Sequence, residues 1–259
     1  MNIDSARHLR PTRILDFEHP AIQALVSERG WNLAEPASRT ATIYDFVRDE
    51  IRFGYNRTDS IPASEVLRDG YGQCNTKTTL LMALLRAAEV PCRLHGATIH
   101  KSLQEGVVTG LFYRLAPSNI LHSWAEVWLA GRWVGLEGVI LDKAYLGGLT
   151  TYLKQTSGPL LGYGVGTADI GSPTIDFSGG PTSIQMTGVN RDFGVFPDPD
   201  AFYAARGANF SGPRALLFSS VVRHWMNRRV ERIRGCGADV ACGQSPKRRG
   251  SEDHRGSNP

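Results

Sequence analysis

The chain has 259 residues, of which 41% are hydrophobic, and its formal net charge is +4. This length and composition allow a substantial buried core and exclude a collagen-like or generally disordered chain. The charge excess is too small to indicate a polyanionic partner. Because the N-terminus is charged and no apolar run approaches the length of a membrane span, we expect a cytoplasmic protein that does not enter membranes.

Four segments are expected along the chain. We predict an N-terminal arm over residues 1–36, a core over residues 37–157, a loop-rich segment with a C-terminal helix packed on that core over residues 158–242, and a disordered tail over residues 243–259. The third segment is rich in Gly, Pro, Ser and Thr at its start, which favours loops with short strands. The tail is polar and basic and has no apolar periodicity.

The predicted C-terminal helix covers Arg214 to Arg234. Apolar residues recur along it at helical spacing and predict a buried stripe. They are Leu216, Leu217, Val221, Trp225 and Val230.

The four cysteines are Cys74, Cys92, Cys236 and Cys242, and their spacing forms no metal-binding or disulfide framework. In a reducing compartment we expect thiols, with a Cys236–Cys242 disulfide as the alternative. Cys74 stands apart because it follows a turn-rich run and begins an apolar helix. The free N–H groups and positive dipole end of a helix start would lower the thiol pKa. The competing interpretation is a small buried residue.

A hairpin is predicted around Ala130-Gly131. Residues 121–129 alternate with period two, which places His122, Trp124, Glu126 and Trp128 on one face. A two-residue turn pairs Leu129 with Arg132.

This register brings Glu137 to the face of His122, one diagonal step away, while Asp142 lies beyond it. A carboxylate there would hold the imidazole and favour its protonated form. The alternatives are a hydrogen-bonded structural histidine and a solvated glutamate.

Three motifs in this order resemble the transglutaminase-like superfamily, over about residues 37–142. They are Gly-Gln-Cys at 72–74, before a helix and Val-Pro-Cys-Arg, then His-Ser-Trp-Ala-Glu-Val at 122–127, and Gly-Arg-Trp-Val-Gly-Leu-Glu at 131–137. The resemblance implies an α+β fold. Its papain-like core would pack a nucleophile helix on an antiparallel sheet, here with a loop-rich and helical C-terminal extension.

The resemblance also implies a catalytic triad, with Cys74 as nucleophile, His122 as base and acid, and Glu137 as the residue that orients the histidine. One departure concerns the third motif, because the family usually has Asp followed by Pro where this chain has Glu137 and Gly138. A longer carboxylate can perform the same task.

The expected function is acyl transfer or amide hydrolysis through a thioester, on a peptide or other amide-containing substrate. Water as acceptor gives a peptidase, amidase or deamidase, whereas an amine gives a transferase, and the sequence does not separate them. The alternative is a catalytically silent binding domain of the same fold.

Other partners and cofactors are not expected. Arginines cluster near the C-terminal helix end, where a solvated helix face is a simpler interpretation than nucleic-acid binding. They are Arg223, Arg228, Arg229, Arg232 and Arg234. His95 and His100 lack the pattern of a metal site, and we expect no cofactor.

Overall fold

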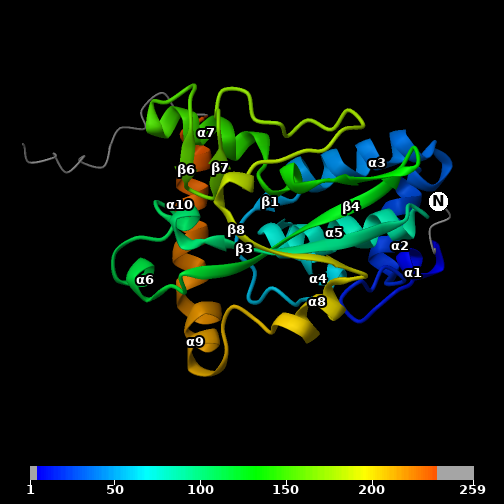
Figure 1. Cartoon of the computed structure of the whole chain (residues 1–259), viewed down its shortest axis with the longest axis horizontal. Helices are drawn as coiled ribbons and strands as arrows, with labels where there is room; N and C mark the ends of the chain where they lie inside the picture. The colour runs from blue at the N-terminus through cyan, green and yellow to red at the C-terminus, as the bar shows by residue number, and fades with distance from the viewer. Residues whose placement is uncertain (1–4, 238–259) are drawn as a thin grey trace, which may run out of the picture.

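The computed structural model describes residues 5–237 (Figure 1). The tail predicted over residues 243–259 therefore lies outside the described residues. The α-helices are α1 (Ser5–Leu9), α2 (Pro20–Glu28), α3 (Pro36–Asp45), α4 (Ala63–Asp69), α5 (Cys74–Ala87), α6 (Gly110–Leu115), α7 (Lys143–Leu153), α8 (Pro199–Arg206), α9 (Gly212–Leu217) and α10 (Arg223–Gly235). The strands are β1 (Arg52–Phe53), β2 (Tyr71–Gly72), β3 (Cys92–His100), β4 (Asn119–Leu129), β5 (Arg132–Gly135), β6 (Leu160–Gly162), β7 (Val165–Thr167) and β8 (Val189–Phe196).

Short turns of 3-10 or π-helix complete the element order. They are η1 (Trp31–Leu33), η2 (Phe46–Glu50), η3 (Lys101–Gln104), η4 (Glu137–Ile140), η5 (Met186–Gly188) and η6 (Phe218–Val222).

The central sheet has the order β5-β4-β3-β8, and each neighbouring pair is antiparallel. Its inner pair runs from Cys92 opposite Val127 to His100 opposite Asn119. The edge strand β8 comes from the glycine-rich segment, whose sequence shows little periodicity. That segment therefore contributes to the sheet that carries the candidate site.

Helix α5 packs on β4 and is the most buried helix of the fold, so the α+β architecture predicted from the sequence is confirmed. Its apolar residues Leu80, Leu81 and Leu84 are fully buried, as their spacing predicts. Its first turns are buried as well, although they are polar, and their side chains bond to neighbouring elements. Helix α5 is thus enclosed on all sides.

The predicted stripe of the C-terminal helix is wrong in its first half. Leu216 and Val221 are 70% and 50% exposed, whereas Met226, Val230 and Ile233 are buried. The π-helical turn η6 interrupts the regular spacing between α9 and α10, so residues before it face a different direction from that expected of one continuous α-helix.

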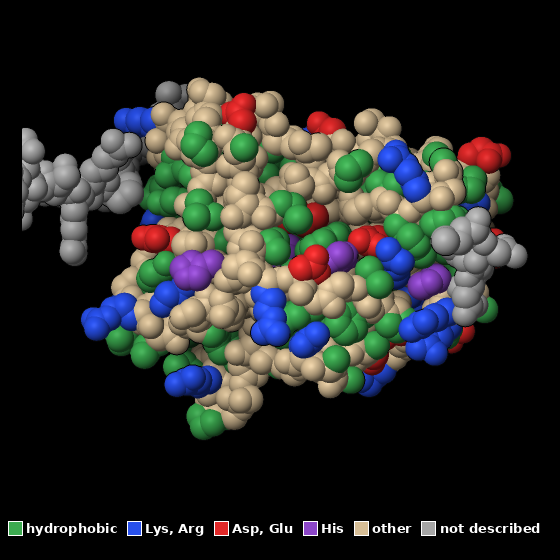
Figure 2. Space-filling view, in the orientation of Figure 1, with side chains coloured by type: hydrophobic (Ala, Val, Ile, Leu, Met, Phe, Trp, Pro, Cys, Tyr) green, Lys and Arg blue, Asp and Glu red, His purple; other side chains and the backbone are tan. Residues whose placement is uncertain are grey.

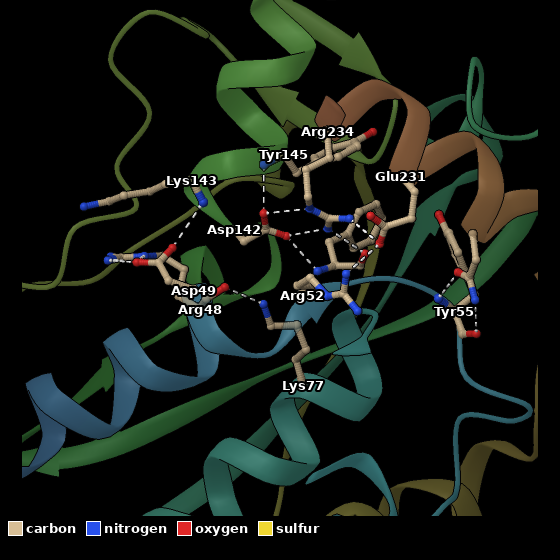
Figure 3. Close-up of polar contacts among 12 residues, drawn as sticks. Arg48, Asp49, Arg52, Tyr55, Lys77, Asp142, Lys143, Tyr145, Glu231 and Arg234 are labelled. Carbon is tan, nitrogen blue, oxygen red and sulfur yellow. Dashed lines mark hydrogen bonds and ion pairs between the residues drawn. The ribbon is translucent and has the colours of Figure 1, made fainter. Parts of the chain in front are cut away.

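Helix α10 is fixed to the core by a buried ion pair between Asp142 and Arg234, whose closest atoms are 2.8 Å apart (Figure 3). Asp142 also accepts hydrogen bonds from the backbone N–H groups of Phe53 and Tyr145. Burial alone would raise the pKa of the Asp142 carboxyl, but the Arg234 guanidinium and the Phe53 N–H hold it below its ordinary value. Asp142 therefore pairs with Arg234, whereas the carboxylate beside His122 is that of Glu137.

Two further findings concern expectations from the sequence. Cys74 and Cys92 are free thiols, but Cys236 is disulfide-bonded, so the expectation of a thiol at Cys236 is wrong. Within residues 5–237, no helix combines the length and apolar character needed to cross a bilayer.

Candidate active site

Cys74 is the first residue of α5, as the turn-rich run before it predicts. The backbone N–H of Gln73 donates to Thr76 Oγ1, which closes the first turn of the helix. A side chain on Gly72 would come within 2.7 Å of Thr76 Oγ1, so glycine is required there by the packing of this turn. The backbone thus fixes where the thiol lies.

The environment of Cys74 overturns the expected direction of its pKa shift. The thiol is buried, and this burial raises its pKa well above the ordinary value. The charges of Asp59 and Glu137 raise it further, while the backbone N–H groups of Asn75 and Ser123 act in the opposite direction and do not compensate. The helix start therefore does not lower the pKa of this thiol below its ordinary value.

His122 lies on β4, beside the N-terminal turns of α5. Three hydrogen bonds join these two elements on either side of His122, and their donor–acceptor distances are between 2.9 and 3.1 Å. They run from Asn75 Nδ2 to the carbonyl of Leu121, from Ser123 Oγ to Asn75 Oδ1, and from Thr78 Oγ1 to the carbonyl of Ser123. The register between helix and strand at His122 is thereby fixed.

The imidazole of His122 is fully buried, and its Nε2 lies 3.4 Å from Glu137 Oε1. Neither ring nitrogen has a hydrogen-bond partner within the described part of the chain. A buried nitrogen without a partner is costly, and such contacts often shorten only when substrate binds. With Nε2 facing the carboxylate, Nδ1 is the nitrogen left to accept a proton.

The hairpin has the predicted register, with Leu129 opposite Arg132 and Trp128 opposite Trp133. Ala130 and Gly131 both have positive φ, as a two-residue turn of this kind requires. The ladder ends at Gly135, and Glu137 begins the 3-10 turn η4 instead of continuing the strand. The carboxylate reaches His122 from this turn rather than along a diagonal of the sheet.

Glu137 is held by the segment that follows the predicted core. Its carboxylate accepts hydrogen bonds from the backbone N–H groups of Ile184 and Gln185, with a distance of 3.0 Å from Gln185 N to Oε1. The sequence gives no signal for either residue, because the backbone rather than the side chain makes these contacts.

The structure also explains why glycine follows Glu137. A Cβ on Gly138 would lie 2.9 Å from Thr182 Cβ and from the Tyr44 hydroxyl. The N–H of Gly138 donates to Thr182 Oγ1 at 3.1 Å, a bond that proline cannot make. The departure from the usual motif thus follows from the close approach of residue 182.

A cavity of about 210 Å³ gives access to Cys74. Its walls are mainly apolar and come from β1 and its following loop, α6, β4 and the C-terminal helices, with several polar residues among them. The polar residues that line the cavity are Arg57, Thr58, Asp59, Gln73, Asn75, Gln104, Gln185, Asn209 and Arg214, and Arg57 is paired with Glu65. Among residues 5–237, no group of three or more His, Cys, Asp or Glu side chains is arranged to hold a metal ion.

The family model of the transglutaminase-like superfamily matches residues 25–137. This part of the chain is similar to that superfamily. The match ends at Glu137 and includes Cys74 and His122, and it supports a cysteine-dependent enzyme of the transglutaminase-like type. No curated protein matches the sequence significantly.

Two solved structures are similar to this chain. One is a candidate cysteine protease from Cytophaga hutchinsonii, with 14% identity, a TM-score of 0.46, and coverage of 78% of this chain and 50% of that one. The other is red sea bream transglutaminase, with 18% identity, a TM-score of 0.29, and coverage of 48% and 25%. The chain thus spans at most half the length of either structure.

Proposed function

We propose that this protein is a thiol hydrolase or acyltransferase that acts on peptide or other amide substrates through a thioester at Cys74. The observation that carries the proposal is the placement of His122. Its Nε2 faces the carboxylate of Glu137, and its strand is bonded to the helix that begins with Cys74. A nucleophile, a base and an orienting carboxylate in this order are the parts required for acyl transfer.

The reaction begins from a protonated thiol, because burial raises the pKa of Cys74. As the sulfur attacks the substrate carbonyl carbon, His122 Nδ1 takes the thiol proton, and the carboxylate of Glu137 stabilises the imidazolium through Nε2–H. The imidazolium then gives its proton to the leaving nitrogen, the C–N bond breaks, and a thioester remains on Cys74. Water or an amine attacks this thioester and regenerates the thiol.

Nucleic acid is not proposed as a partner. Arg229 donates to the carbonyl of Gly106 and to the Tyr152 hydroxyl, and Arg234 pairs with Asp142. These two arginines of the C-terminal cluster therefore already have hydrogen-bond or ion-pair partners within the protein. On the face drawn in Figure 2, basic side chains are dispersed rather than gathered into one patch.

The test is the capture of the acyl-enzyme with p-nitrophenyl acetate, followed by intact mass and peptide mapping. We expect a transient acetyl adduct on Cys74, and faster loss of the adduct when a primary amine is added if the enzyme is a transferase. Cys74→Ala should lose the adduct, whereas Cys92→Ala, which removes the other free thiol of residues 5–237, should keep it. A folded wild-type protein that never acetylates Cys74 would instead be a silent binding domain.

A further inference from the structure

The side chain of Asp59 lines the same cavity as Cys74 and is not used in the proposed reaction. It lies in the loop between β1 and α4, and amide groups hold both of its oxygens. Gln73 Nε2 donates to Oδ1 and Asn209 Nδ2 donates to Oδ2, each at 2.7 Å. Because Gln73 directly precedes the nucleophile, these bonds fix the carboxylate next to the start of α5.

Within the described residues, no Lys, Arg or His side chain forms an ion pair with Asp59; its carboxylate bonds to the amides of Gln73, Asn209 and Asn75, and the Tyr203 hydroxyl donates to its backbone carbonyl. Amide donors satisfy hydrogen bonds but supply no positive charge. Asp59 is half-buried, and a partly desolvated carboxylate without a paired cation is costly, so burial raises the pKa of Asp59. A purely structural role would require acceptor oxygens but not a negative charge.

The charge of Asp59 also opposes loss of the proton from the Cys74 thiol. After burial, it is the largest influence that raises the pKa of Cys74. A cation that binds beside Asp59 would remove this opposition at the moment when the sulfur loses its proton. Substrate binding and activation of the nucleophile would then be coupled.

We propose that Asp59 binds a cationic amine of the acyl donor, so that the preferred substrates are amides whose acyl part carries an ammonium group close to the scissile carbonyl. The proposal rests on the proposed function, since it takes Cys74 as the nucleophile. An ammonium held by a carboxylate has no lone pair and cannot attack a thioester, so the cation belongs to the donor rather than to an acceptor amine. The apolar walls of the cavity, including Phe112 and Met226, would contact the remainder of the donor.

The test compares three methanethiosulfonates, from which the Cys74 sulfur takes an RS group to form a mixed disulfide while methanesulfinate leaves. The probes are the neutral methyl reagent, the cationic 2-(trimethylammonio)ethyl reagent and the anionic 2-sulfonatoethyl reagent. Each rate at Cys74, measured by peptide mass, is divided by the rate with N-acetylcysteine. In the wild type we expect the cation to be favoured over the neutral reagent by about tenfold, as one nearby charge in a partly desolvated site allows, and the anion to be slowest.

Asp59→Asn should abolish this order, Asp59→Glu should keep it, and Glu18→Gln, which removes an exposed carboxylate elsewhere, should leave it unchanged. A wild-type cation-to-anion ratio near one would overturn the proposal without any variant. An order that persists in folded Asp59→Asn would overturn it as well. Either result leaves the acetyl adduct at Cys74 unaffected, so failure of this inference is distinguishable from failure of the proposed function.

Discussion

Replacing Glu137 by Gln should remove most of the activity while leaving the fold intact. The N–H groups of Ile184 and Gln185 both point at the carboxylate, so the amide oxygen of the new side chain must turn toward them. Its NH2 group is then directed toward His122 Nε2, 3.4 Å away in the wild type. An NH2 group donates to Nε2, which forces the proton of the neutral imidazole onto Nδ1 and removes the lone pair that must accept the thiol proton.

The size of the effect follows from the charge that is lost. At 3.4 Å and an effective dielectric constant of about 20, a carboxylate stabilises an imidazolium by roughly 5 kcal/mol. This energy corresponds to a loss of about 10³- to 10⁴-fold in the rate of acylation. The folded state loses one charge-assisted acceptor, and the free energy of unfolding should fall by only about 1–3 kcal/mol.

The assay is the single-turnover rate of Cys74 acetylation, measured together with urea unfolding. The rate of thiol transfer from the neutral methanethiosulfonate at high pH, where hydroxide can remove the proton, should change far less than the acetylation rate at pH 7. Folded Glu137→Gln protein that acetylates Cys74 within tenfold of the wild-type rate would refute the assignment of Glu137. An equal loss in both rates would indicate a closed cavity rather than a missing base.

Three further predictions concern the surrounding structure. Asp142→Asn should lower the free energy of unfolding by about 3 kcal/mol, because it removes the buried carboxylate that pairs with Arg234 and leaves this arginine only its more exposed partner Glu231. The acetylation rate of the folded protein should stay unchanged, and a loss comparable to that of Glu137→Gln would contradict our choice of triad carboxylate. Ile233→Ala should cost about 2–5 kcal/mol because the side chain is fully buried, whereas Leu216→Ala should change stability by less than about 0.5 kcal/mol, and both values are measurable by urea unfolding. Burial lowers the pKa of Lys77 to about 7. Above that pH the unfolded chain holds one more proton than the folded protein, so the free energy of unfolding of the wild type should rise with pH relative to that of Lys77→Met, by up to about 1.4 kcal/mol per pH unit. A difference between the two proteins that stays constant from pH 6 to 9 would contradict the burial of an uncharged lysine.

The sequence determined the elements that carry the candidate site. The start of α5 at Cys74 follows from the turn residues before it, and the hairpin register follows from period-two alternation around Ala130-Gly131. These features depend on interactions between residues close in the chain, which a local pattern can report. The family motifs add the order of Cys74, His122 and Glu137, whose catalytic roles remain predictions.

Only the tertiary structure decided the environment of these residues. The pKa of Cys74 is raised rather than lowered because the first turn of α5 is buried beneath other elements. Glu137 is held by backbone groups of residues 184–185, and Asp59 reaches the cavity through bonds to Gln73 and Asn209. Contacts between residues tens to more than a hundred positions apart leave no periodicity in the sequence, and burial, which sets the sign of a pKa shift, depends on all of them together.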